Sequence, residues 1–310
     1  MTIRIPWLDR QLEKLLISRD EIESLKNIGN NIYDEIRAWS PLKLIFLKYY
    51  AVGIYTPIIK RRYRNMYYVD LFSGSGINKI ERKQDFCLGS PLLISKLIPE
   101  SIRFNKMFFC DKESAKTEAL NLRMKSTGIS ENSYEIYSGD CNDCIDDIIS
   151  SFQSPNHSLI FIDPYSMEIS WTTMNKILKL QSDIIFCFQT VQIPRAHEGE
   201  NLESFFKDIE KVDEIYATTP RGSVREAILQ LYINDMLSER AEDSIYEKIR
   251  IKKDRRFFYD IIFMTRKTSG DNPWMKAIRD AKNQIEKNTS EAVKRSLNVL
   301  TGRQRTLRSY

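Results

Sequence analysis

The chain has 310 residues, of which 42% are apolar and 29% are charged, and its net charge is +5. This is an ordinary globular balance, which allows one large α/β domain with additions or two small domains. The five cysteines lack the regular spacing of a disulfide framework, and no apolar run approaches the roughly 18 residues of a membrane span. We therefore expect a cytoplasmic protein with no membrane association.

Helical periodicity dominates the first part of the chain. Apolar residues between positions 8 and 55 recur mostly at steps of three and four residues. Ser40-Pro41 begins a further helix over residues 42–50, with serine as the N-cap and proline in the first turn. The sequence therefore predicts an N-terminal helical cap over residues 1–65.

Short apolar runs then alternate with helical segments. The expected strands are residues 66–72, 106–110, 134–137, 158–162 and 183–189, and the expected helices are 92–97, 114–125, 144–152 and 171–180. This alternation predicts a mostly parallel α/β sheet with helices on both faces. A helix over 224–237 and an antiparallel hairpin over 249–252 and 257–266 follow. We place this core at residues 66–290 and a basic tail at 291–310.

The first expected strand runs into a turn that contains two glycines. Glycine lets the backbone turn tightly and lets a ligand approach closely, and in open α/β sheets ligands bind outside the carboxyl ends of the strands. The alternative is a core turn without a ligand. The candidate ligand-binding residues of this turn are Asp70, Phe72, Ser73, Gly74 and Gly76. Lys79 stands where a dinucleotide-binding fingerprint has its third glycine, which disfavours an NAD dehydrogenase.

Carboxylates follow the next two expected strands. Asp111 comes at the end of the second strand, where a carboxylate can accept both hydroxyls of a ribose. Asp140 follows the third strand in Ser138-Gly139-Asp140. For each of them the alternative is a helix cap.

Asp163-Pro164-Tyr165 follows the fourth strand, which this topology puts at the centre of the sheet. The Asp163 carboxylate and the Pro164 carbonyl can accept hydrogen bonds from an exocyclic amine and so align its nitrogen for reaction. The Tyr165 ring can stack on a base, a contact worth about 1–3 kcal/mol. The alternative is a strand-to-helix turn without chemistry.

Several short motifs, in their order, resemble known families. Asp-Leu-Phe-x-Gly-Ser-Gly, which starts at Asp70, resembles motif I of amino- and RNA-type methyltransferases, and Asp163-Pro164-Tyr165 resembles their Asp/Asn-Pro-Pro-Tyr/Phe motif. Over most of residues 35–280 the chain resembles the three-Cys-motif partner protein family. The motifs that carry this resemblance are, in order, Trp39-Ser40 with Lys43, residues 68–76, Gly89-Ser90-Pro91-Leu92, residues 161–165, and residues 259–266 with Pro273-Trp274. Ser166, and Cys187-Phe188-Gln189, depart from the family pattern.

This resemblance implies a Rossmann-like class I methyltransferase with S-adenosylmethionine as cofactor. It also implies that Asp140 contacts the adenine amino group, and that a protein bearing three cysteines is a partner. A nucleic-acid base is the expected methyl acceptor, with tRNA or rRNA slightly preferred over DNA. The alternatives are a catalytically silent module that binds nucleic acid or a protein, and a small-molecule methyltransferase.

Clustered basic residues favour a polyanionic partner. The clusters are Arg61, Arg62 and Arg64; Lys252, Lys253, Arg255 and Arg256; and Lys294, Arg295, Arg303, Arg305 and Arg308. Cys141 and Cys144 form a CxxC pair, but a zinc site needs a second pair of ligands, so we expect no metal.

Overall fold

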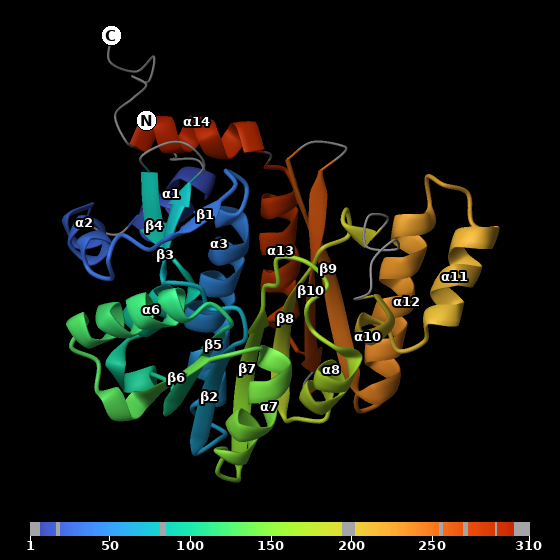
Figure 1. Cartoon of the computed structure of the whole chain (residues 1–310), viewed down its shortest axis with the longest axis horizontal. Coiled ribbons are helices and arrows are strands. Elements are labelled where there is room, and N and C mark those ends of the chain that lie inside the picture. Colours follow the sequence, from blue (N-terminus) through green and yellow to red (C-terminus); the bar gives the residue numbers. More distant parts are fainter. Residues whose placement is uncertain are drawn as a thin grey trace.

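The computed structural model describes residues 7–16, 19–80, 85–193, 202–253, 257–268, 272–288 and 290–300. Within these residues a seven-stranded sheet forms the centre of the fold (Figure 1). In spatial order its strands are β6 (Tyr134–Ser138), β5 (Lys106–Asp111), β2 (Asn65–Asp70), β7 (Asn156–Ile162), β8 (Ser182–Phe188), β10 (Phe258–Arg266) and β9 (Ser244–Lys252).

The first five strands of this order are parallel, and β10 is antiparallel to both β8 and β9. The chain leaves β2 toward β5 and β6, then returns and builds β7 and β8 on the other side of β2. The expected mostly parallel α/β sheet, with its C-terminal antiparallel hairpin, is confirmed.

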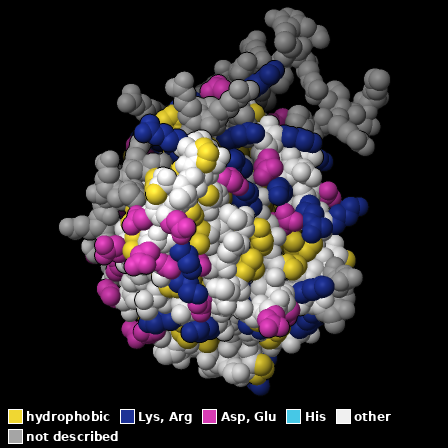
Figure 2. All heavy atoms as spheres, turned by 90° about the vertical axis from the view of Figure 1, so that its right-hand side faces the viewer, with side chains coloured by type: hydrophobic (Ala, Val, Ile, Leu, Met, Phe, Trp, Pro, Cys, Tyr) yellow, Lys and Arg dark blue, Asp and Glu magenta, His cyan; other side chains and the backbone are white. Residues whose placement is uncertain are grey.

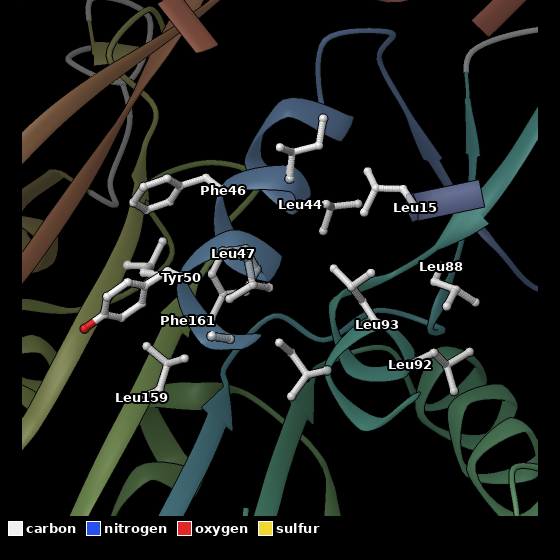
Figure 3. Packing of buried hydrophobic residues seen from close by; sticks show 14 of the residues in the cluster. Leu15, Leu44, Phe46, Leu47, Tyr50, Leu88, Leu92, Leu93, Leu159 and Phe161 are labelled. Atoms are coloured by element: carbon white, nitrogen blue, oxygen red, sulfur yellow. The ribbon is translucent and has the colours of Figure 1, made fainter. Parts of the chain in front are cut away.

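Helices cover both faces of the sheet. One buried cluster takes residues from α1 (Trp7–Leu16), α2 (Arg19–Asn27), α3 (Pro41–Tyr50), α5 (Ser90–Leu97), α6 (Ser114–Ser126) and α13 (Met275–Glu286). The other takes residues from α7 (Cys141–Ser150), α8 (Trp171–Leu178), α10 (Leu202–Phe205), α11 (Ile209–Thr218) and α12 (Val224–Glu239). Successive strand residues alternate between the two clusters, because side chains on a strand point to opposite faces. Figure 3 shows Leu47 and Tyr50 of α3 beside Leu159 and Phe161 of β7.

The helix α3 continues through the π-helical segment η1 (Ala51–Tyr55) into α4 (Thr56–Ile59). Among the described residues, Pro41–Ile59 is the one helix long and apolar enough to span a membrane, so the expectation that no run approaches that length needs correction. More than half of this helix is buried, and Leu42, Phe46 and Leu47 are fully enclosed in the core. Packing against the sheet accounts for its apolar composition.

A small second sheet is the main feature that the sequence did not predict. Its strands lie in the order β1 (Asp34–Ile36), β3 (Ile77–Ile80) and β4 (Asp85–Leu88), with β1 parallel to β3. Residues 34–36 had been expected to continue a helical pattern. Strands of three or four residues are too short to show an alternating pattern. The expected cap is therefore not wholly helical, and its boundary at residue 65 stays a prediction.

The C-terminal part of the chain is also more ordered than a tail. The helix α14 (Ser290–Leu300) lies along α1, where the Ser296 hydroxyl donates a hydrogen bond to Asp9. Residues 301–310, which include Arg303, Arg305 and Arg308, lie outside the described residues. The described residues also form the short 3-10 helices η2 (Glu100–Ile102) and η3 (Glu131–Ser133).

One buried cation joins the N-terminal helices to the sheet. The Arg123 side chain on α6 is fully enclosed, and its guanidinium donates to the carbonyl oxygens of Leu25 at 3.0 Å, Ile32 at 2.6 Å and Ser75 at 2.7 Å. Burial lowers the pKa of Arg123 to about 10. The guanidinium on α6 thereby joins the segment that contains Leu25 and Ile32 to the turn at Ser75.

We expect Arg123→Met to lower the free energy of unfolding by about 2–5 kcal/mol, because three buried carbonyl groups lose a charged donor. Urea denaturation of the variant and the wild type measures this. Lys125→Met, on an exposed face of the same helix, is the matched control and should change stability by less than about 0.5 kcal/mol. An equal effect of the two substitutions would show that Arg123 does not hold these segments.

Candidate functional site

The turn between β2 and β3 is held from three directions. The Gly74 N–H donates to Asp111 Oδ2 at 2.8 Å, and the Ser75 N–H donates to Asp34 Oδ2 at 2.7 Å. The Ser75 carbonyl accepts the bond from Arg123, and its hydroxyl donates to Asp34 Oδ2 at 2.9 Å. Lys116 pairs with the other oxygen of Asp34, at 3.1 Å. The backbone of the turn is thus fixed by groups from β5, β1 and α6.

Internal packing explains both glycines of this turn. Gly74 has φ +61°, and a Cβ atom there would lie 2.5 Å from Asp34 Oδ2. Gly76 has φ +81°, and a Cβ atom there would lie 2.8 Å from Leu120 Cδ1. Neither contact involves a ligand. The glycine pattern alone therefore indicates a tight turn, and the evidence for a ligand has to come from the groups around it.

Asp70 points into the fold. It is fully buried, and its carboxylate accepts hydrogen bonds from the Tyr68 hydroxyl at 3.2 Å and from the Phe72 N–H at 3.4 Å. Burial raises the pKa of Asp70 to about 7, and the nearby charge of Asp163 adds to this. Phe72 is half-buried and packs on the cluster beneath α7 and α8. Asp70 is thus placed to support the turn from within.

Ser73 leaves an unused hydrogen-bonding group in the turn. Its N–H donates to the Cys110 carbonyl at 2.9 Å. Its hydroxyl, in a residue only 4% exposed, has no hydrogen-bond partner among the described residues. A buried polar atom without a partner is costly. The Ser73 hydroxyl is one of several buried side-chain atoms without a partner in the described residues, and it is the one that lies in the glycine turn.

Asp111 lies at the end of β5, beside the turn. Its two oxygens accept from the Gly74 N–H and from the Glu113 N–H at 3.0 Å. Burial raises the pKa of this carboxyl group above its ordinary value, although both N–H groups stabilise the charge. A carboxylate accepts about four hydrogen bonds. Asp111 is partly exposed, so its carboxylate can accept further hydrogen bonds.

Asp140, at the end of β6, is the N-cap of α7. Its carboxylate accepts from the Asn142 N–H at 2.8 Å, which is the capping role left open by the sequence. The Asn142 side chain also donates to Oδ1 of Asp140, at 2.8 Å. Asp140 remains exposed, so the predicted contact with adenine stays a prediction.

Asp163 and Pro164 already have partners within the chain. The Lys43 ammonium from α3 forms an ion pair with Asp163, and both side chains are 15% exposed. The Pro164 carbonyl accepts from Gln189 Nε2 at 3.0 Å. The expected arrangement, in which both acceptors face an incoming amine, is thus incomplete in this structure. Tyr165, by contrast, is 85% exposed.

Two carboxylates of this region escaped the sequence analysis. Glu168 accepts from the backbone N–H groups of Tyr165 at 2.9 Å and Ser166 at 3.2 Å, and it pairs with Lys112. It orients the turn that presents Tyr165. An acidic residue two or three positions after a turn residue can accept hydrogen bonds from the backbone N–H groups of that turn, so the sequence position of Glu168 could have indicated this role. Asp34 had no such signal, since 41 residues separate it from Ser75.

The basic clusters lie on different edges of the molecule. Arg61, Arg62 and Arg64 immediately precede β2 and so lie at the amino ends of the strands, opposite the glycine turn. Lys252 and Lys253 lie at the carboxyl edge, because Asp260 on β10 pairs with Phe188 at the end of β8. Arg255 and Arg256 lie outside the described residues. The face that carries α11 shows acidic and basic side chains side by side (Figure 2).

The five cysteines, including Cys141 and Cys144, are free. Within the described part of the chain, no group of three His, Cys, Asp or Glu side chains is placed to hold a metal ion.

No family model and no curated protein matches the chain. Among solved structures, an O-methyltransferase from Streptomyces achromogenes in complex with S-adenosylmethionine is 11% identical over 86% of this chain and 92% of its own, with a TM-score of 0.39. An O-methyltransferase from Bacillus cereus with S-adenosylhomocysteine is 10% identical over 84% and 98%, with a TM-score of 0.44. The Trm1 protein of Pyrococcus horikoshii with S-adenosylmethionine is 11% identical over 81% and 58%, with a TM-score of 0.39. Identities this low carry over no function.

The raised pKa of Asp70 makes stability depend on pH. Between about pH 4 and pH 7 the folded protein holds a proton at Asp70 that the unfolded chain has lost, so this group stabilises the fold at low pH and ceases to do so as pH rises through about 7. Asp70→Asn removes the titration. The free energy of unfolding of the wild type, relative to Asp70→Asn, should fall by roughly 2–3 kcal/mol from pH 5 to pH 8.

Chemical denaturation of both proteins in the same buffers measures this difference, and the comparison cancels groups that titrate in both. A difference independent of pH would mean that Asp70 is ionised throughout this range.

Proposed function

We propose that the chain is an S-adenosylmethionine-dependent methyltransferase. The observation that carries the proposal is the strand order. The connections diverge on either side of the junction between β2 and β7, which is the switch point where open α/β sheets bind ligands. The glycine turn and Asp163 follow these two strands.

The residues at this edge fit the cofactor. Asp111 would hold the ribose hydroxyls, Asp140 the adenine amino group, and the unpartnered Ser73 hydroxyl would take a further polar contact. The remaining cofactor contacts would come from the turn of Phe72, Gly74 and Gly76, supported from within by Asp70. When bound, the cofactor supplies an activated methyl group, so the chain has mainly to hold the acceptor in line with it.

We infer further that the acceptor is a nucleic-acid base, with RNA slightly preferred over DNA. The exposed ring of Tyr165 offers a stacking surface, and Lys252 and Lys253 put positive charge on the same edge of the sheet. Asp163 and Pro164 would orient the acceptor. Membership of the three-Cys-motif partner family and a three-cysteine protein as partner remain proposals from the sequence resemblance. A cytoplasmic location remains a proposal from the cysteine pattern and the composition.

Titration calorimetry with S-adenosylmethionine tests the cofactor site. Asp111→Asn keeps an acceptor for the Gly74 N–H but loses the charge that would hold the ribose, so we expect affinity to fall at least tenfold, about 1.4 kcal/mol. Asp146→Asn, which alters an exposed carboxylate on α7, is the control and should bind as the wild type does. Absence of binding to the wild type would end the proposal.

Transfer of labelled methyl from S-adenosylmethionine to total cellular RNA or DNA tests the acceptor class. We expect incorporation into RNA. Salt-sensitive binding of RNA without transfer would favour a catalytically silent module. Binding of the cofactor with transfer only to small molecules would favour a small-molecule enzyme.

A further inference from the structure

The groups expected to accept hydrogen bonds from an amine are already occupied by donors of the chain. Lys43 serves Asp163, and the Gln189 amide serves the Pro164 carbonyl. Asp163 can accept further hydrogen bonds, but an exocyclic amine would bring its donor hydrogens against those of Lys43 and Gln189. Because an ammonium has three hydrogens and Asp163 does not use them all, Lys43 can donate further hydrogen bonds at this edge.

Lys43 keeps its charge at this position. Burial by itself would lower the pKa of Lys43, but the charge of Asp163 and its hydrogen bond outweigh burial, with help from Cys187 and Asp70, and raise it. Lys43 therefore stays protonated near neutral pH, where it is a donor next to Asp163 and cannot act as a base.

Aromatic rings and a second ammonium continue outward from Lys43. Its Nζ lies 6.0 Å from the centre of the Tyr259 ring. Phe257 immediately precedes β10, and 42% of its surface is exposed. Lys253 Nζ lies 5.3 Å from the Phe257 ring and 5.9 Å from the Trp39 ring. We call these residues, Lys43, Trp39, Lys253, Phe257 and Tyr259, the donor strip.

Tyr259 adds an unused hydrogen-bonding group to the strip. The residue is 7% exposed, and its buried hydroxyl has no hydrogen-bond partner within the described residues. Together with the rings and the ammonium groups, this describes a site for a flat ligand that carries acceptor oxygens and negative charge.

We propose that the donor strip binds a methyl acceptor with a ring imide or lactam, an N–H beside a carbonyl as in uracil or guanine, in preference to an exocyclic amine. This inference rests on the proposed function and narrows its substrate class. Lys43 is assigned to the carbonyl oxygen of that group, and the rings of Trp39 and Phe257 to the plane of the base.

The chemistry follows from the ion pair. The ring N–H gives its proton to the Asp163 carboxylate, and the Lys43 ammonium, released from that charge, donates to the carbonyl oxygen on which negative charge develops. With S-adenosylmethionine bound, the nitrogen electron pair would form the bond to the methyl carbon. The carbon–sulfur bond would break, and the electrons of that bond would go to sulfur, leaving a thioether. Asp163 then returns the proton to water.

The test measures how protein saturated with S-adenosylhomocysteine binds nucleoside monophosphates. We expect uridine monophosphate to bind at least about tenfold tighter than cytidine monophosphate, or guanosine monophosphate tighter than adenosine monophosphate by the same factor. Lys43→Met should bring these ratios to within twofold of one. Lys43→Arg, which keeps a charged donor, should retain the preference, and so should Lys48→Met, a control further along α3.

Equal or tighter binding of the amine-bearing nucleotide in both pairs, or no binding of either imide-bearing nucleotide, would overturn the inference. So would a preference that survives in Lys43→Met. Failure of S-adenosylhomocysteine to bind would instead contradict the proposed function, and it is measured first in the same titrations.

Discussion

The whole site depends on how one turn is held. Asp111, Asp34 and Arg123 each bind a different backbone group of the Gly74-Ser75 turn, and they come from β5, β1 and α6. Because the polar backbone groups of the turn are satisfied by the chain itself, its shape is set before any ligand arrives. The buried Ser73 hydroxyl, by contrast, is a polar group of the turn for which the described residues supply no partner.

This arrangement gives the N-terminal segment a role beyond covering the sheet. Asp34 lies on β1, and the carbonyls of Leu25 and Ile32 accept from Arg123. The helix α3 brings Lys43 to Asp163. The segment before β2 thus contributes both to the turn that would receive the cofactor and to the pair that would receive the acceptor, and removing it would take charged groups out of both.

The ion pair between Lys43 and Asp163 changes the chemistry expected of the Asp-Pro-Tyr motif. If the oxygens of such a motif had no partner in the chain, they would suit an amine as the methyl acceptor. Where an ammonium neutralises the carboxylate, as Lys43 does here, the motif suits a methyl acceptor that loses a proton. Two partly exposed charges at the centre of an edge are costly unless they are paired. The pair is therefore both a structural necessity for Asp163 and the feature that would select the substrate.

The sequence predicted those features of the fold and site that are set by residues close together along the chain. The parallel strands are buried apolar runs, and the carboxylates Asp111, Asp140 and Asp163 follow three of them, so their common edge could be predicted from spacing alone. The short strands β1, β3 and β4 carry too few residues for a pattern. Contacts such as Asp34 with Ser75, or Lys43 with Asp163, join residues 41 and 120 positions apart and leave no local signal. The two glycines correctly predict a tight turn. Packing against Asp34 and Leu120 already explains why glycine stands at both positions, so they give no separate evidence for a ligand.

A crystal structure of the protein with S-adenosylhomocysteine tests the central claim most directly. The account predicts that the turn keeps its backbone bonds to Asp34, Asp111 and Arg123, that the ribose hydroxyls lie within hydrogen-bond distance of Asp111, and that the sulfur faces the Lys43–Asp163 pair. A nucleoside bound elsewhere, or a turn that must give up its bonds to Asp34 and Asp111 to admit it, would contradict the account.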